Sequence, residues 1–132
     1  MENIKTVEDA FIACGMDPKA RPDVSSFPEE LRKYMLNHFE LLMITKAINK
    51  REDGTFWQPD WNNSSQWKYF PWFEIKADKG SPWGFGFSLT YYGYGYSVTA
   101  GGSRLCFSSS EDALYAAKQF EEHYEINLLM LK

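Results

Sequence analysis

Two short segments carry the residue types best suited to holding a ligand. One places Trp57 and Trp61 on either side of Asp60, and a second alternates tyrosine with glycine over residues 91–96. Aromatic faces stack on bases, sugars or apolar groups, and polar groups between the rings fix the orientation of a ligand. An isolated cation in a later strand-like segment completes the candidate binding residues: Trp57, Asp60, Trp61, Tyr92, Tyr94 and Arg104.

Each of these features also has a purely structural interpretation. Asp60 and the asparagines that follow it can hydrogen-bond their own loop while the tryptophans fill the core. The tyrosine–glycine run can be a hairpin in which tyrosines cover a sheet and glycines relax the turn. Arg104 can pair with Glu74 or lie against an aromatic ring. The sequence leaves both interpretations open.

Catalytic and metal-binding chemistry have less support. The two histidines and two cysteines of the chain are scattered, and their positions match no metal-ligand spacing. His38 lies on the apolar face of a predicted helix, which favours a structural histidine, and His123 lies at the edge of another apolar face, near Glu122. We therefore predict no metal and no cofactor. A small enzyme acting through Asp60, Glu74 or His123 is kept as an alternative.

The N-terminal part of the chain has the periodicity of two helices. Residues 7–14 form a predicted helix that Thr6 caps, with Asp9 at the capping-box position and Gly15 at its end. A second predicted helix begins at Ser26 and runs to about Asn49, and its C-terminal half is apolar on more than one side.

From residue 68 the pattern changes to period two. Residues 68–76, 84–91, 96–99 and 104–107 predict strands of an antiparallel meander, with turns at 93–95 and 101–102. The alternation assigns these rings to the interior: Tyr69, Phe73, Phe85, Phe87, Tyr91 and Phe107. A last helix begins at Ser108 or Ser109, with small alanines that allow close approach to the sheet. The predicted fold class is α+β: two N-terminal helices, an aromatic-rich antiparallel sheet of three to four strands, and a C-terminal helix packed on the sheet, in one domain of residues 1–132.

The composition and net charge of the chain argue against some classes of function. The chain is 44% hydrophobic and 24% charged, as in soluble globular domains, and its 17% of aromatic residues is high. Its net charge of −4 argues against a dedicated nucleic-acid binder, because affinity for phosphate comes mainly from lysine and arginine. There is no secretory signal pattern and no apolar run of about 20 residues, so we predict no membrane association.

The cysteines and the tail complete these expectations. Cys14 and Cys106 lack disulfide or redox spacing, which indicates buried thiols in a reducing, cytoplasmic setting. The tail from Ile126 to Leu131 is unusually apolar, so we expect it to be docked or to form a homo-oligomer contact.

Four segments together resemble a known family. They are residues 57–62 (WQPDWN), 68–75 (KYFPWFEI), 102–107 (GSRLCF) and 112–120 (DALYAAKQF). They resemble a family of short uncharacterised proteins from prophages and mobile elements of Bacteroides-type bacteria, over nearly the whole chain. The resemblance implies a bacterial or phage-infected cell and assigns no activity or catalytic residue.

These observations predict a small, non-enzymatic binding or interaction module of phage or mobile-element origin. Its expected contact surface is an exposed part of the aromatic band formed by Trp57, Trp61, Tyr92 and Tyr94, with Arg104 beside it, and its expected partner is another protein. Single-stranded nucleic acid, bound by stacking on the tyrosines, is a further alternative.

Overall fold

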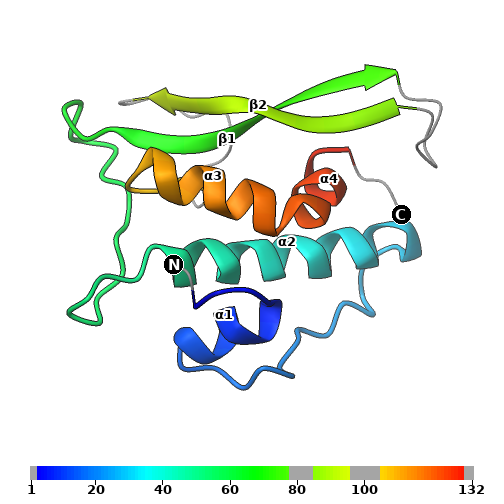
Figure 1. Cartoon of the computed structure of the whole chain (residues 1–132). Helices are drawn as coiled ribbons and strands as arrows, with labels where there is room; N and C mark the ends of the chain where they lie inside the picture. Colours follow the sequence, from blue (N-terminus) through cyan, green and yellow to red (C-terminus); the bar gives the residue numbers. More distant parts are fainter. Residues whose placement is uncertain (1–2, 78–84, 96–104, 130–132) are drawn as a thin grey trace.

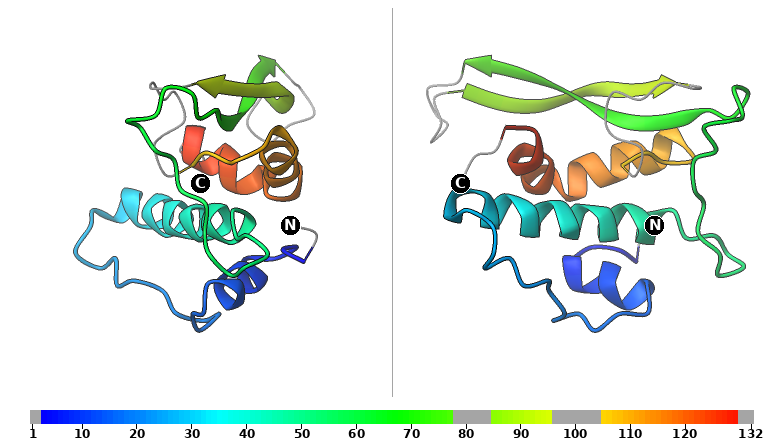
Figure 2. Two further views of the ribbon diagram at one scale, coloured as in Figure 1. Left: turned by 90° about the vertical axis from the view of Figure 1, so that its left-hand side faces the viewer. Right: turned by 180° about the vertical axis from the view of Figure 1, so that it is seen from behind.

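The computed structural model describes residues 3–77, 85–95 and 105–129, and helices predominate in these ranges. In chain order the elements are α1 (Val7–Ala13), α2 (Glu29–Ile48), β1 (Lys68–Ala77), β2 (Phe85–Gly95), α3 (Ser110–Gln119) and α4 (Glu121–Leu129). They stack in layers, as Figures 1 and 2 show: the β1–β2 ribbon covers α3 and α4, α2 lies beneath these two helices, and α1 lies on the far side of α2.

Helix α1 forms as its sequence predicts. The Asp9 amide donates to the Thr6 hydroxyl at 3.1 Å, and the Thr6 amide donates to the Asp9 carboxylate at 3.1 Å, which completes the predicted capping box. A further hydrogen bond from the Lys5 amide is the main cause that lowers the pKa of Asp9. Gly15 follows the helix with a φ of 74°, a conformation that glycine adopts without strain.

Helix α2 is the central element of the stack. It begins at Glu29, after Pro28, and not at Ser26 as predicted. Its C-terminal half is buried on several sides, as predicted, through Leu41, Met43, Ile44, Thr45, Ala47 and Ile48. In the part of the chain that the structure describes, no helix combines the length and apolar character needed to cross a membrane.

The predicted sheet of three to four strands is wrong. Within the described ranges β1 and β2 form a two-stranded antiparallel sheet, and the segment at Phe107 joins it only through an isolated bridge to Tyr69. The glycines at 93–95 do not turn the chain, because they stay extended and pair with residues 68–70. The predicted strand at 96–99 lies outside the described residues. The fold is therefore a helical stack with a β-ribbon, and not an α+β fold built on a broad aromatic sheet.

The single predicted C-terminal helix is also wrong, because the chain forms two helices there. Ser109 caps α3 by accepting from the Asp112 amide at 3.2 Å, and α3 ends where Phe120 leaves helical geometry with its side chain buried. Helix α4 then lies against α2, where the Asn37 amide donates to the His123 carbonyl at 2.8 Å. The predicted oligomer contact from Ile126 to Leu131 is described only up to residue 129, so it stays a prediction.

The hydrophobic core lies where α2, α3, α4 and the residues 105–107 meet. Ala113 and Ala116 of α3 are fully buried in this core, and α3 contacts both strands of the ribbon and not the broad sheet that was predicted. Phe107 is fully buried, as its alternation predicts, and Tyr69 and Phe73 pack partly buried against the same cluster. The side chains of the other three rings assigned to the interior lie outside those described.

The core contains one polar group whose removal should not harm the fold. The Tyr124 hydroxyl is buried without a well-formed hydrogen bond, and burial raises the pKa of this phenol while the nearby Thr45 hydroxyl opposes the rise. Thr45 donates its own proton to the Leu41 carbonyl at 2.8 Å. We expect Tyr124→Phe to leave the free energy of unfolding unchanged or raise it by about 1 kcal/mol, because a poorly satisfied buried hydroxyl is removed. Urea unfolding checks this, and a clear loss of stability would show a hydrogen bond at the hydroxyl.

Candidate functional site

Trp57 is buried, so its predicted place on an exposed aromatic surface is wrong. Its side chain is among the most buried of the aromatic residues in the described ranges, with a relative exposure of 9%. The turn at Asp53 and Gly54 folds the chain back, so that Phe56 bridges to Lys50 and the Trp57 amide donates to the Asn49 carbonyl at 2.9 Å. The indole is held against the C-terminal half of α2.

Asp60 follows its structural interpretation. Its carboxylate accepts from the Asn62 amide at 3.0 Å, and its backbone amide donates to the Gln66 side chain at 2.6 Å. The Asn63 amide donates to the Asp60 carbonyl at 3.2 Å. Asp60 therefore shapes the loop at 60–66, and its contacts within the described residues are contacts with that loop.

Trp61 is partly buried because a lysine lies against its ring. The Lys68 ammonium is 5.1 Å from the centroid of the Trp61 ring and donates to the Asn63 carbonyl at 2.9 Å. The Lys68 side chain is only 1% exposed. Sequence reasoning missed this contact, because Lys68 looked like an ordinary first residue of a strand. One face of the Trp61 ring is thus already occupied by a cation.

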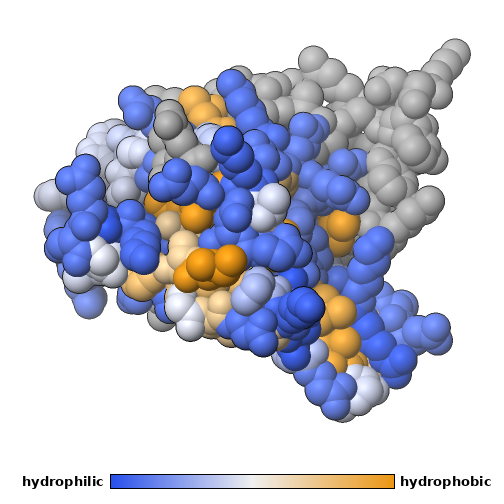
Figure 3. All heavy atoms as spheres, turned by 60° about the horizontal axis from the view of Figure 1, so that its bottom comes forward, coloured by the Kyte–Doolittle hydropathy of each residue, from blue (hydrophilic) through white to orange (hydrophobic). Residues whose placement is uncertain are grey.

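The remaining sequence candidates are only partly described. The backbones of Tyr92 and Tyr94 pair with Pro71 and Tyr69 across the ribbon, and their side chains lie outside those described. Arg104 lies outside the described residues. The structure therefore describes the side chains of three of the six candidates: Trp57 lies against α2, and Asp60 and Trp61 lie in the loop at 60–66. On the face shown in Figure 3, apolar side chains form separate patches divided by hydrophilic ones.

Trp57 instead forms one side of a cleft, which we call the α2 cleft. It has a volume of about 300 Å³ and lies between the C-terminal half of α2 and the residues 56–59, with Cys106 at one end. That volume is at the small end of the ~300–1,000 Å³ typical of ligand pockets. Its lining is mainly apolar, and the residues that matter below are Leu42, Met43, Lys46, Phe56, Trp57 and Gln58.

Hydrogen bonds fix one end of the α2 cleft. The Asn49 side chain donates to the Cys106 carbonyl at 2.9 Å and accepts from the Ser108 amide at 3.3 Å. These bonds tie the end of α2 to the segment that leads into α3. Asn49 is 6% exposed, so its amide serves the structure and leaves little of its bonding capacity for a ligand.

Two lysines set the charge beside the α2 cleft. The Lys46 ammonium is 4.8 Å and the Lys50 ammonium 5.8 Å from the centroid of the Phe56 ring. Lys50 also donates to the Ala13 carbonyl at 3.1 Å, which joins the end of α1 to α2. Burial raises the pKa of the nearby Cys14 thiol, and the charges of Lys46 and Lys50 act against this rise.

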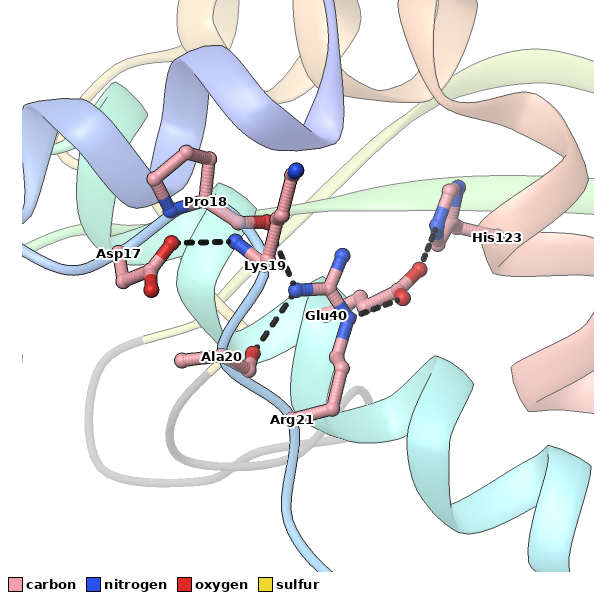
Figure 4. A network of polar contacts seen from close by, with 7 residues as sticks. All are labelled: Asp17, Pro18, Lys19, Ala20, Arg21, Glu40 and His123. Atoms are coloured by element: carbon pink, nitrogen blue, oxygen red, sulfur yellow. Dashed lines mark hydrogen bonds and ion pairs between the residues drawn. The ribbon is translucent and has the colours of Figure 1, made fainter.

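A second cavity, the α4 cavity, lies between α2 and α4. It has a volume of about 330 Å³, and its lining includes Lys33, Leu36, Glu40, Glu122, His123 and Ile126. Figure 4 shows the polar contacts beside it: Glu40 receives a 2.9 Å bond from Arg21 and lies 2.9 Å from the His123 ring. His123 was expected at a surface boundary near Glu122, and the structure pairs it with Glu40.

These polar contacts join three parts of the chain. Arg21 also donates from Nη1 to the carbonyls of Pro18 and Ala20, and its guanidinium lies 4.2 Å from the centroid of the Phe11 ring. Through Glu40 it links the connector before α2 to α4. The second histidine, His38, meets Asn127 of α4 at 2.7 Å, which confirms its structural interpretation.

The alternative of a small enzyme acting through Asp60, Glu74 or His123 gains no support from the described contacts. Asp60 bonds its own loop, His123 pairs with Glu40, and the Glu74 side chain is not described. The lining of the α4 cavity contains no serine, threonine or cysteine, so it offers the Glu40–His123 pair no hydroxyl or thiol to activate. In the ranges 3–77, 85–95 and 105–129, no group of three or more potential ligand side chains could hold a metal ion.

Two signals in the sequence could have pointed to the α2 cleft. Lys46 lies in the last turn of α2 and Lys50 follows the end of that helix, so the sequence places two cations close together there. The Asp53–Gly54 turn, with a φ of 88° at Gly54, returns the chain so that Phe56 reaches Lys50. Comparisons of the chain with protein-family models, with curated proteins and with solved structures return no match, so the resemblance to the prophage family stays a prediction.

Proposed function

We propose that this protein is a small non-enzymatic binding module and that the α2 cleft is where it holds an apolar group of its partner. The observation that carries the proposal is the position of Trp57: the sequence marks it as a binding residue, and its indole lines a cleft of about 300 Å³. The resemblance in the sequence favours a phage or mobile-element setting for this module.

The lining of the α2 cleft supports this function. Leu42, Met43, Phe56 and Trp57 supply apolar surface, and burial of such surface is the main driving force of most protein association. Asn49 and Thr45 have hydrogen-bond partners within the chain, so an apolar group that enters leaves these two polar side chains paired. The lining suits one large apolar side chain or a pair of fused rings.

The neutral fluorophore phenylnaphthylamine tests this proposal, because its fluorescence rises when it enters an apolar site. We expect saturable one-to-one binding by the wild type. Leu42→Trp fills the α2 cleft and should weaken binding about tenfold or more, because the added ring occupies the space of the ligand. Leu36→Trp makes the same change on the same helix at the α4 cavity, and it should bind as the wild type does.

Thermal unfolding must show that both variants remain folded. Gln58→Trp places a ring from an exposed residue over the α2 cleft and serves as a second blocking variant should Leu42→Trp not fold. Absence of saturable binding to the wild type, or equal binding by the variants at Leu42 and Leu36, would contradict the proposed function. Salt-sensitive binding of oligonucleotides without phenylnaphthylamine binding would favour the nucleic-acid alternative.

A further inference from the structure

We propose that the α2 cleft selects an anionic apolar group, and that its natural occupant is a segment of a partner protein in which an acidic residue neighbours an apolar anchor. This inference rests on the proposed function and adds the charge and the source of the ligand. It also explains why Lys46 lies in the lining, which the binding of an apolar group alone does not explain.

The charges beside the α2 cleft carry the inference. Lys46 lines the cleft and its ammonium lies 4.8 Å from the centroid of the Phe56 ring, which is itself part of the lining. Lys50 approaches the same ring at 5.8 Å. Among the described residues the ion pairs join Arg21 and His123 to Glu40, and neither lysine takes part in one. A carboxylate of the ligand could therefore bind these two ammonium groups without first breaking an ion pair among the described residues.

The side chains of Lys46 and Lys50 differ in how firmly they are held. Lys50 is held by its bond to the Ala13 carbonyl, whereas the described contacts of Lys46 are limited to the Phe56 ring. Lys46 is exposed and can turn toward a bound anion while its stem still covers part of the apolar lining. Lys46 is therefore the residue expected to select for charge, and Lys50 supplies a fixed positive field behind it.

The shape of the α2 cleft favours a segment of a protein, and not a small molecule, as its ligand. A small-molecule site buries most of its ligand, typically 70–90% of the ligand surface. The α2 cleft is small, and its outer side is formed by the chain at 56–59, where Gln58 is exposed. This geometry suits one anchoring side chain that projects from a longer chain, with the acidic neighbour lying over Lys46.

A matched pair of probes tests the charge. Anilinonaphthalene sulfonate differs from phenylnaphthylamine by one sulfonate group, so the ratio of their dissociation constants isolates the contribution of the negative charge. We expect the wild type to bind the sulfonate about fivefold more tightly at low salt, which is the scale of an exposed ion pair. Lys46→Met should bring the ratio close to one, because the sulfonate probe loses the ammonium group that selects it and phenylnaphthylamine has no charge to lose. Lys33→Met, at the α4 cavity, should leave the ratio as in the wild type.

The outcomes separate this inference from the proposed function. Failure of phenylnaphthylamine to bind overturns the proposed function, whereas equal binding of both probes, or a ratio unaffected by Lys46→Met, overturns only the inference.

Competition against the bound sulfonate probe tests whether the ligand of the α2 cleft is a protein segment or a small aromatic acid. The blocked peptide acetyl-Asp-Phe-Asp-amide should displace the probe at lower concentration than phenylpropionate does, and the reverse order would show a site for small aromatic acids.

Discussion

Replacing Phe107 with alanine should lower the free energy of unfolding by about 3–5 kcal/mol, the usual cost of removing a buried phenylalanine. Phe107 is fully buried in the cluster where α2, α3 and α4 meet. Its backbone also exchanges hydrogen bonds with Tyr69, at 2.7 and 3.0 Å, and so connects β1 to the helical core. Urea unfolding monitored by circular dichroism measures the change.

Ile12→Ala is the matched control for this loss. Ile12 is a large apolar residue that is 62% exposed, so its truncation should change the free energy of unfolding by no more than about 0.5 kcal/mol. A loss below about 1 kcal/mol for Phe107→Ala would contradict the central position of this ring.

Replacing Asn49 with alanine should cost about 2 kcal/mol, because it removes one buried and one partly buried hydrogen bond at once. The Asn49 amide is the link between the end of α2 and the residues 106–108, through the Cys106 carbonyl and the Ser108 amide. Because the same link fixes one end of the α2 cleft, the variant should also bind phenylnaphthylamine more weakly. Urea unfolding and the probe titration measure the two effects separately.

Asn62→Ala provides the comparison for Asn49→Ala. Asn62 lies exposed in the loop that Asp60 organises, and the bond that connects it to Asp60 comes from its backbone amide. Truncation of its side chain should change stability by less than about 0.5 kcal/mol. Equal losses for the two asparagines would show that the link at Asn49 has no special importance.

Local signals predicted the two N-terminal helices well, and they predicted the sheet and the C-terminal helices poorly. Thr6 and Asp9 predicted the cap of α1, and the apolar stripes of α2 predicted its burial, because these features depend on neighbours three or four residues away. Pairing of strands depends on distant residues. Gly93 and Gly95 look like turn residues, yet they stay extended because residues 68–70 lie opposite them. Phe120 ends α3 because its ring is buried in the core, which no local pattern shows.

The sequence predicted the candidate site only in part, because the contacts that form it also join residues that are distant in the sequence. The sequence drew attention to Trp57 and to the hydrogen-bonding capacity of Asp60, and both have defined places in the structure. Whether a tryptophan is exposed depends on what lies opposite it, and here α2 covers Trp57 while Lys68 covers one face of Trp61. The contact between Lys46 and Phe56 requires the chain to turn back at Gly54, so it becomes visible only in the fold.

Mapping the bound probe by nuclear magnetic resonance is the most direct test of the central claim that the α2 cleft is the binding site. Phenylnaphthylamine is titrated into nitrogen-labelled protein, and the amide and indole signals are followed. We predict that the largest shifts fall on the Trp57 indole N–H and on the amides of Met43, Lys46 and Gln58. Shifts concentrated at Lys33 and His123 around the α4 cavity, or at Trp61 and Trp67, would contradict the claim.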